Sequence, residues 1–129
     1  MQLHTTEADL SQPDLPNVDG ERYDGVLLDA PCTGLGNLGR HPELRWNCRY
    51  EDIATCAELQ RRLLLRCLDR VRPGGRLVYA VCSLEPEEGP LLVHAVAAER
   101  GWAVELEQAW TPELEGTDGF YLARLRAPT

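Results

Sequence analysis

The sequence predicts an α/β domain in which parallel β-strands alternate with helices. Short apolar runs bounded by turn residues alternate with segments whose apolar residues recur at three- and four-residue steps. The resulting order is strand, helix, strand, helix, strand, and strands joined by helices run parallel through right-handed crossovers. The chain has 129 residues, enough for one domain, which we expect to span residues 1–129.

The first strand is expected at Tyr23–Asp29, after a loop rich in proline, aspartate and asparagine at residues 11–22. Its apolar centre, Val26 to Leu28, suits a strand buried on both faces. Residues 30–49 are rich in glycine, proline and asparagine and predict a long irregular loop. A loop of this length in a compact domain is usually functional.

A helix is predicted at residues 51–71, because the apolar residues there fall on one helical face. These residues are Ile53, Cys56, Leu59 or Gln60, Leu63, Leu64, Cys67, Leu68 and Val71. The segment Arg72-Pro73-Gly74-Gly75 ends the helix. A second buried strand is expected at Arg76–Cys82.

Ser83 is placed to cap a second helix that stops at Gly101. The first turn of this helix would hold Glu85, Glu87, Glu88 and Pro90, all favoured near a helix N-terminus. Two further strands are predicted at residues 102–106 and 119–125. No helix is predicted between them, so we expect them to pair antiparallel at one edge of the sheet.

Composition limits the function classes. The net charge of −8 argues against a nucleic-acid partner for this chain taken alone, because phosphate binding normally needs a basic surface. No apolar run is long enough to cross a membrane and the start is no signal peptide, so we expect a cytoplasmic protein without a membrane partner. No pair of the five cysteines has Cys-x-x-Cys spacing, so we expect no metal.

Two cysteines and a carboxylate follow the first two predicted strands. The strands end in Asp29-Ala30-Pro31-Cys32 and in Val81-Cys82-Ser83. Ligands of open α/β sheets bind beyond the carboxyl ends of the strands, and neighbouring strands lie about 5 Å apart. We therefore expect Asp29, Cys32 and Cys82 to converge at one rim of the sheet.

The alternative is that these cysteines are small core residues, as most cysteines are. That interpretation is favoured for Cys56 and Cys67, which lie on the apolar helix face, and Cys48 receives no role. Cys32 and Cys82 differ because they stand at strand ends, and Cys82 directly precedes the acidic helix start, where a thiolate is favoured. For Asp29, a loop cap and a chemical role are about equally favoured.

The segment Arg40-His41-Pro42-Glu43-Leu44-Arg45-Trp46 places basic and aromatic side chains in the long loop. Arg40, His41 and Arg45 are candidates to bind phosphate, with Trp46 stacking on a base. Solvated loop charge is the alternative, and composition alone favours it slightly.

These segments resemble the RNA cytosine-5 methyltransferases, most closely the Fmu/Sun type that modifies small-subunit ribosomal RNA. Asp29-Ala30-Pro31-Cys32-Thr33-Gly34 is similar to one family motif, and residues 40–46 resemble its basic His-Pro stretch. Residues 74–88, which contain Val81-Cys82-Ser83, resemble a second motif, and residues 118–125 resemble the closing strand. Val81 and Gly89 depart from the family, which usually has threonine and asparagine there.

The resemblance implies a Rossmann-like, S-adenosylmethionine-dependent methyltransferase sheet, of which this chain would be the C-terminal half. It implies that Cys82 adds to carbon 6 of cytosine, that Asp29 hydrogen-bonds the base, and that Cys32 assists loss of the carbon-5 proton and release of the enzyme. It places Asp9, Asp29 and Pro31 at the cofactor. In the related DNA enzymes the Pro-Cys cysteine is the nucleophile, so the roles of Cys32 and Cys82 remain exchangeable on sequence logic.

The glycine-rich turn and the acidic ribose contact of the family's cofactor-binding half have no counterpart upstream of Asp29, where Met1–Asp9 resembles the tail of a third strand. We therefore expect two partners: RNA (ribosomal, or alternatively transfer RNA) and a missing N-terminal part of the same enzyme, which would carry the basic surface. Alone, the chain is expected to be inactive. The alternative function is a non-catalytic methyltransferase-like module for RNA or protein assembly. Generic nucleotide binding is disfavoured, because no phosphate-binding glycine loop is present.

Overall fold

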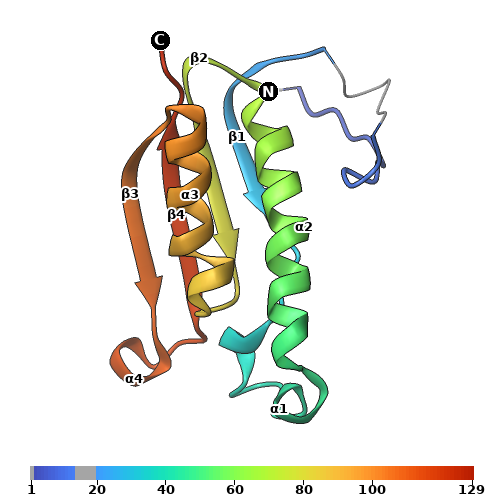
Figure 1. The fold of residues 1–129 in the computed structure, drawn as a ribbon, viewed down its shortest axis with the longest axis vertical. Coiled ribbons are helices and arrows are strands. Elements are labelled where there is room, and N and C mark those ends of the chain that lie inside the picture. Colours follow the sequence, from blue (N-terminus) through green and yellow to red (C-terminus); the bar gives the residue numbers. More distant parts are fainter. Residues whose placement is uncertain (1, 14–19) are drawn as a thin grey trace.

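The computed structural model describes residues 2–13 and 20–129, which include one four-stranded sheet of order β1-β2-β4-β3 (Figure 1). The strands are β1 (Tyr23–Asp29), β2 (Val71–Val81), β3 (Ala103–Trp110) and β4 (Phe120–Arg126). β1 and β2 are parallel, whereas β4 runs antiparallel to both of its neighbours, β2 and β3. The predicted α/β class is confirmed, as a partial Rossmann-like domain with a mixed sheet.

Two long helices, α2 (Tyr50–Leu68) and α3 (Pro90–Arg100), lie on the same face of the sheet (Figure 1). α2 begins at Tyr50 because the Asp52 carboxylate accepts the Arg49 backbone N–H at 2.7 Å, and α3 ends at the left-handed Gly101, as predicted. The short helices are η1 (Leu35–Asn37), α1 (Leu44–Asn47), η2 (Pro86–Glu88) and α4 (Pro112–Glu115).

The core lies between this helix layer and the sheet. Leu64 of α2, Val93 of α3 and Tyr79 of β2 are completely buried there, and the ring of Tyr79 meets that of Tyr121 edge to face. The opposite face of the sheet is much more exposed. The expectation that the first strand is buried on both faces is therefore wrong, because Leu28 is 5% exposed on the helix side and Leu27 is 70% exposed on the other.

The predicted antiparallel pairing of the last two strands is confirmed, with Ala109 of β3 opposite Tyr121 of β4. Their expected place at the sheet edge holds for β3 alone, because β4 inserts between β2 and β3. The antiparallel strand is therefore interior, and the two edges are β1 and β3. The one-turn helix α4, which the sequence pattern did not indicate, connects the pair.

Three local expectations differ from the structure. Val71, expected at the end of the first helix, begins β2 and is buried. The acidic segment after Ser83 is not the first turn of α3, because η2 and Gly89 separate it from the start of α3 at Pro90. Residues 2–9, expected to resemble the tail of a third strand, form no helix or strand and pair with none of the four strands described. Met1 lies outside the described residues.

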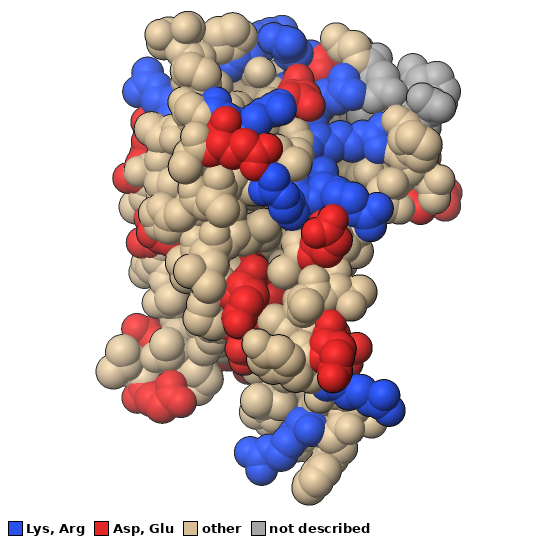
Figure 2. Space-filling view, viewed as in Figure 1, with Lys and Arg blue, Asp and Glu red and all other residues tan. Residues whose placement is uncertain are grey.

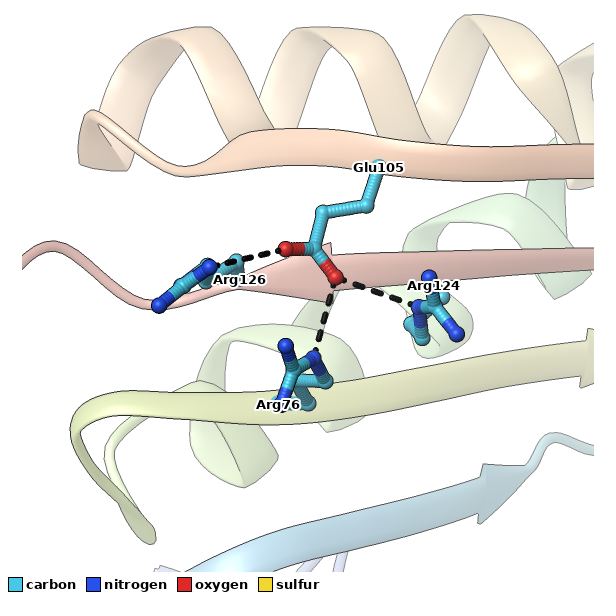
Figure 3. Close-up of polar contacts among 4 residues, drawn as sticks. All are labelled: Arg76, Glu105, Arg124 and Arg126. Carbon is cyan, nitrogen blue, oxygen red and sulfur yellow. Dashed lines mark hydrogen bonds and ion pairs between the residues drawn. The ribbon is translucent and has the colours of Figure 1, made fainter.

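An ion-pair cluster occupies the exposed face of the sheet (Figure 3). Glu105 stands at a bulge of β3 and contacts three arginines. They are Arg76 of β2 at 3.0 Å and Arg124 and Arg126 of β4 at 3.1 and 3.3 Å. One carboxylate on β3 thus offsets the mutual repulsion of three cations on β2 and β4. None of the helices described is long and apolar enough to span a membrane.

Candidate active site

Cys32 and Cys82 meet at the carboxyl ends of β1 and β2, with their Sγ atoms 3.3 Å apart. The Ala30 N–H donates to the Ala80 carbonyl at 3.0 Å and so extends the β1–β2 ladder one residue beyond β1. Cys32 follows two residues later, and Cys82 directly follows β2. Both side chains are half-buried. The two thiols therefore lie together at one rim of the sheet, as expected from the sequence.

The proton of Cys32 is held tightly. Burial and the hydrogen bond with Cys82 raise the pKa of the Cys32 thiol to about 12, and the charge of nearby Glu88 acts in the same direction. Cys32 is therefore protonated at neutral pH and can donate to the sulfur of Cys82. The sequence-based argument that a helix N-terminus favours the Cys82 thiolate does not hold, because α3 starts only at Pro90.

A close backbone contact fixes the loop after Cys32. The Gly36 N–H donates to the Cys82 carbonyl at 3.1 Å, and the Gly36 carbonyl accepts the Gly119 N–H at 2.7 Å. A Cβ at Gly36 would stand 2.0 Å from the Gly119 oxygen and 2.9 Å from the Cys82 oxygen. Only glycine allows the loop to lie this close to the ends of β2 and β4.

Glu88 is a buried residue of the site that the sequence-based reasoning missed. Its carboxylate is completely buried and accepts hydrogen bonds from Thr33 beside Cys32, from Ser83 beside Cys82 and from Gln60 of α2. Within a run of acidic residues after a strand, Glu88 had the pattern of a solvated helix start. The available signal was Gln60, a polar residue on the apolar face of α2 that needed a buried partner.

Asp29 ends β1 with its side chain exposed, and it makes no hydrogen bond or ion pair that the described residues reveal. It pairs in register with Ala80 and so lies at the same strand ends as the cysteines. The neighbouring Pro31 is exposed, and its carbonyl accepts a hydrogen bond from Gln60 at 2.9 Å. Asp29 is thus a carboxylate available to a ligand at the rim.

Asp9 is not part of this cluster. Its carboxylate accepts hydrogen bonds from Ser11 and Gln12 within its own turn, which keeps its pKa below the usual range. The same stretch of chain is held by Arg66, which donates to the carbonyls of Leu10 and Pro13. Arg66 lies six residues after Gln60, or about 9 Å farther along a helix that leads away from the cysteines.

The basic loop lies at the same end of the molecule but is partly neutralised. Arg40 pairs with Asp118 at 2.9 Å, and His41 contacts Glu43 at 3.0 Å. Arg45 belongs to α1, and Trp46 is 83% exposed. On the face in Figure 2, basic residues gather mainly at the end away from α1, and a smaller basic group lies near α1. No group of metal-ligating side chains among the described residues could hold a metal ion.

The sheet and its helices have a methyltransferase fold. They are similar in fold to the N-methyltransferase NodS from Bradyrhizobium japonicum, with a TM-score of 0.54, 14% identity, and coverage of 95% of this chain and 58% of that one. A much closer solved structure is NSun6 from Pyrococcus horikoshii with SFG. Its TM-score is 0.82 at 30% identity, and the match covers 96% of this chain and 34% of that one.

The chain belongs to the 16S rRNA methyltransferase RsmB/F family, whose profile matches residues 1–126. It is 35% identical to ribosomal RNA small subunit methyltransferase B from Shewanella oneidensis over 95% of this chain and 32% of that protein. Its identity to the protein of the same name from Vibrio cholerae is 42%, over 82% of this chain and 26% of that protein. The chain thus spans about a third or less of the length of these relatives, and the Fmu/Sun resemblance is confirmed.

Proposed function

We propose that this chain supplies the reacting residues for transfer of a methyl group from S-adenosylmethionine to carbon 5 of cytosine in ribosomal RNA. The observation that carries the proposal is the contact of Cys32 and Cys82, 3.3 Å apart at the carboxyl ends of two parallel strands, in a member of an rRNA methyltransferase family. Residues 1–129 form the C-terminal part of the catalytic domain in this proposal.

Cys82 is the nucleophile. Its thiolate forms a bond to carbon 6 of cytosine, and the electron pair of the 5,6 double bond shifts toward the base edge, which makes carbon 5 nucleophilic. The exposed carboxylate of Asp29 accepts hydrogen bonds from that edge, from the amino group and from N3, which takes up a proton from solvent as the electron pair arrives there. The target base must leave its stack to reach these groups, so we expect a single-stranded or loop target.

Cys32 is the base that removes the proton from carbon 5. Burial raises the pKa of Cys32 to about 12, and while Cys82 is free its hydrogen bond and its charge add to that effect. Once the Cys82 sulfur is bonded to carbon 6, both contributions disappear and Cys32 releases its proton to solvent more readily. The Cys32 thiolate then takes the proton of carbon 5, the electron pair re-forms the 5,6 double bond, and Cys82 leaves as a thiolate.

S-adenosylmethionine supplies the methyl group when it is bound. The residues present fit such a ligand in part, because Asp29 is an exposed, unengaged carboxylate and Pro31 presents an apolar ring at the same rim. Asp9, whose carboxylate is already bonded to Ser11 and Gln12, fits less well. The remaining cofactor contacts are assigned to the part of the enzyme that relatives have beyond this chain.

The RNA is bound mainly by that additional part, which resolves the conflict with a net charge of −8. Within this chain, Arg45 is the strongest candidate for phosphate binding, and Arg40 and His41 contribute once they exchange Asp118 and Glu43 for phosphate. With a ribosomal RNA target, the location we propose is the cytoplasm.

Trapping on RNA that contains 5-fluorocytosine tests the proposal, because fluorine at carbon 5 cannot leave as a proton and the adduct persists. A polypeptide of the relatives' length that carries this chain should form the adduct, and so should its Cys32→Ala variant. The Cys82→Ala variant should not. An adduct that survives Cys82→Ala but not Cys32→Ala would reverse the two roles, and no adduct in any variant would refute covalent catalysis.

A further inference from the structure

We propose that Glu88 is a positioning residue that fixes the thiols of Cys32 and Cys82 relative to each other. This inference rests on the proposed function. Glu88 stands at the end of η2, between β2 and α3, and touches neither sulfur. Its carboxylate is 0% exposed, although no cation contacts it among the described residues. A buried carboxylate is costly unless hydrogen bonds satisfy it, so its partners show what it does.

Four donors bind the two oxygens of Glu88. Oε1 accepts the Thr33 backbone N–H at 2.9 Å and the Gln60 side-chain amide at 3.0 Å. Oε2 accepts the Thr33 hydroxyl at 2.6 Å and the Ser83 hydroxyl at 2.5 Å. Thr33 directly follows Cys32, and Ser83 directly follows Cys82. One carboxylate therefore ties together the residues that follow the two cysteines, although 50 positions separate the thiols in the sequence.

Gln60 completes the arrangement on the other side of Cys32. Its amide also donates to the Pro31 carbonyl at 2.9 Å, so both neighbours of Cys32 are held by the Glu88–Gln60 pair. The Gln60 Oε1 atom is buried without a partner in the described structure. This side chain therefore serves as a double donor to the loop and to Glu88.

The backbone of Glu88 is fixed as well. Its carbonyl accepts the hydroxyl of Tyr79 at 2.7 Å, and Tyr79 is completely buried in the centre of β2. The carboxylate is thus anchored to the strand that leads to Cys82. Glu88 therefore adds a side-chain link between the loops beyond β1 and β2, which are already joined by the backbone bond from Gly36 to Cys82.

The test uses the 129-residue chain with Cys48→Ser, Cys56→Ser and Cys67→Ala, which leaves the two site thiols. A short bis-alkylating reagent such as dibromobimane reports bridging of a close thiol pair, and a monofunctional reagent reports the reactivity of each thiol. In Glu88→Ala, we expect bridging to slow at least about tenfold relative to single alkylation, because placement errors near 1 Å strongly reduce proximity effects. Loss of folding would also slow bridging, because it separates thiols that lie 50 positions apart in the sequence. Circular dichroism of Glu88→Ala must therefore match that of the parent for the slower bridging to count.

Three further variants test whether Glu88 positions the two thiols rather than only stabilising the fold. Glu88→Gln keeps the shape, and its amide can donate to the hydroxyls of Thr33 and Ser83, so bridging should stay within about threefold of the parent. Thr33→Val, which removes one hydroxyl, should slow bridging severalfold. Glu87→Gln is the matched control, because it removes the same charge from the same short helix and the Glu87 Oε2 atom has no partner among the described residues; it should bridge as the parent does.

Bridging in Glu88→Ala within twofold of the parent would overturn the inference, and so would equal losses in Glu88→Gln and Glu88→Ala. These outcomes are independent of the proposed function, which the 5-fluorocytosine adduct tests. If the longer enzyme forms that adduct, its Glu88→Ala variant should show a much larger decrease in kcat for methyl transfer than increase in KM for RNA. An unchanged kcat would also overturn the inference.

Discussion

The Sγ atoms of Cys32 and Cys82 lie 3.3 Å apart, although the two residues belong to different loops after different strands. A disulfide bond is about 2.05 Å long, so only a small further approach separates this contact from a covalent link.

We predict that glutathione disulfide converts this pair into one internal disulfide. A thiolate of the pair displaces one glutathione thiolate to form a mixed disulfide, and the second thiol of the pair then displaces the other. Peptide mass mapping should find the link between the peptides containing Cys32 and Cys82. The Cys82→Ser variant should stop at a mixed disulfide, and a preferred link through Cys48 or Cys56 would contradict the geometry.

The reactivity of Cys32 should depend steeply on pH. With its pKa raised to about 12 by burial and by Cys82, the Cys32 thiolate fraction should rise about tenfold per pH unit up to that value. Alkylation rates measured between pH 7 and 10 by mass spectrometry test this. Cys82→Ala removes one cause of the raised pKa, so Cys32 should react faster at each pH. A plateau below pH 9 in the parent would contradict the prediction.

The raised pKa of Cys32 also affects stability. The folded pKa lies above the ordinary pKa of a thiol, 9.0, so the unfolded chain loses this proton first as the pH rises. The contribution of Cys32 is complete below about pH 9 and is lost between pH 9 and 12. Urea unfolding should show a steeper loss of stability over that window in the parent than in Cys32→Ala.

Gly36→Ala should disrupt the site and the fold together. The added Cβ meets the Gly119 oxygen at 2.0 Å and the Cys82 oxygen at 2.9 Å, so the backbone must move. Overpacking of this kind costs about 1–3 kcal/mol, which chemical denaturation would measure. Gly39→Ala is the matched control, because a Cβ there meets nothing within 4 Å. Equal stability of the two variants would show that the loop adapts.

Glu105→Gln should lower the thermal midpoint, because Arg76, Arg124 and Arg126 then repel one another without a carboxylate between them. The arginines keep the pKa of Glu105 below its usual range, so its stabilising effect is present above the unfolded pKa and is lost as the pH falls through the folded value. The difference between parent and variant should shrink in acid and in high salt. Glu113→Gln, exposed on α4, should show no such difference.

The 129-residue chain alone should bind S-adenosylmethionine weakly or not at all, because the proposed cofactor contacts in it reduce to the rim around Asp29 and Pro31. Titration calorimetry measures this directly. Micromolar affinity would contradict the assignment of the remaining contacts to the rest of the enzyme.

Much of this fold follows from local patterns. The three- and four-residue spacing of apolar residues predicted α2, and short apolar runs predicted the strands on either side of it. Gly101 marked the end of α3. The place of β4 between β2 and β3 could not be predicted, since the alternation along Phe120–Arg126 shows which side chains are buried but not which strands pair. The exposed side of β1 was missed for a related reason, because an apolar run does not show how many faces have a covering layer.

The site was predictable only where backbone topology decides it. Parallel strands bring their carboxyl ends to one rim, and that rule alone brings Cys32 near Cys82. The hydrogen bonds of Glu88 depend on side-chain directions in three separate segments, which no spacing rule contains. Arg40 and His41 were candidates to bind phosphate, with solvated loop charge as the alternative. Their pairing with Asp118 and Glu43 likewise depends on how the loop folds.

The interior place of β4 has a consequence for synthesis. A ribosome completes β1, α2, β2, α3 and β3 before it reaches residues 120–126. Until then, β2 lacks its second neighbour, and β3 lacks the only strand with which it pairs in the described sheet. The nascent chain therefore presents two open strand edges that can pair with other chains. A stall before residue 120 would leave a product prone to aggregation, because residues 120–126 close the sheet.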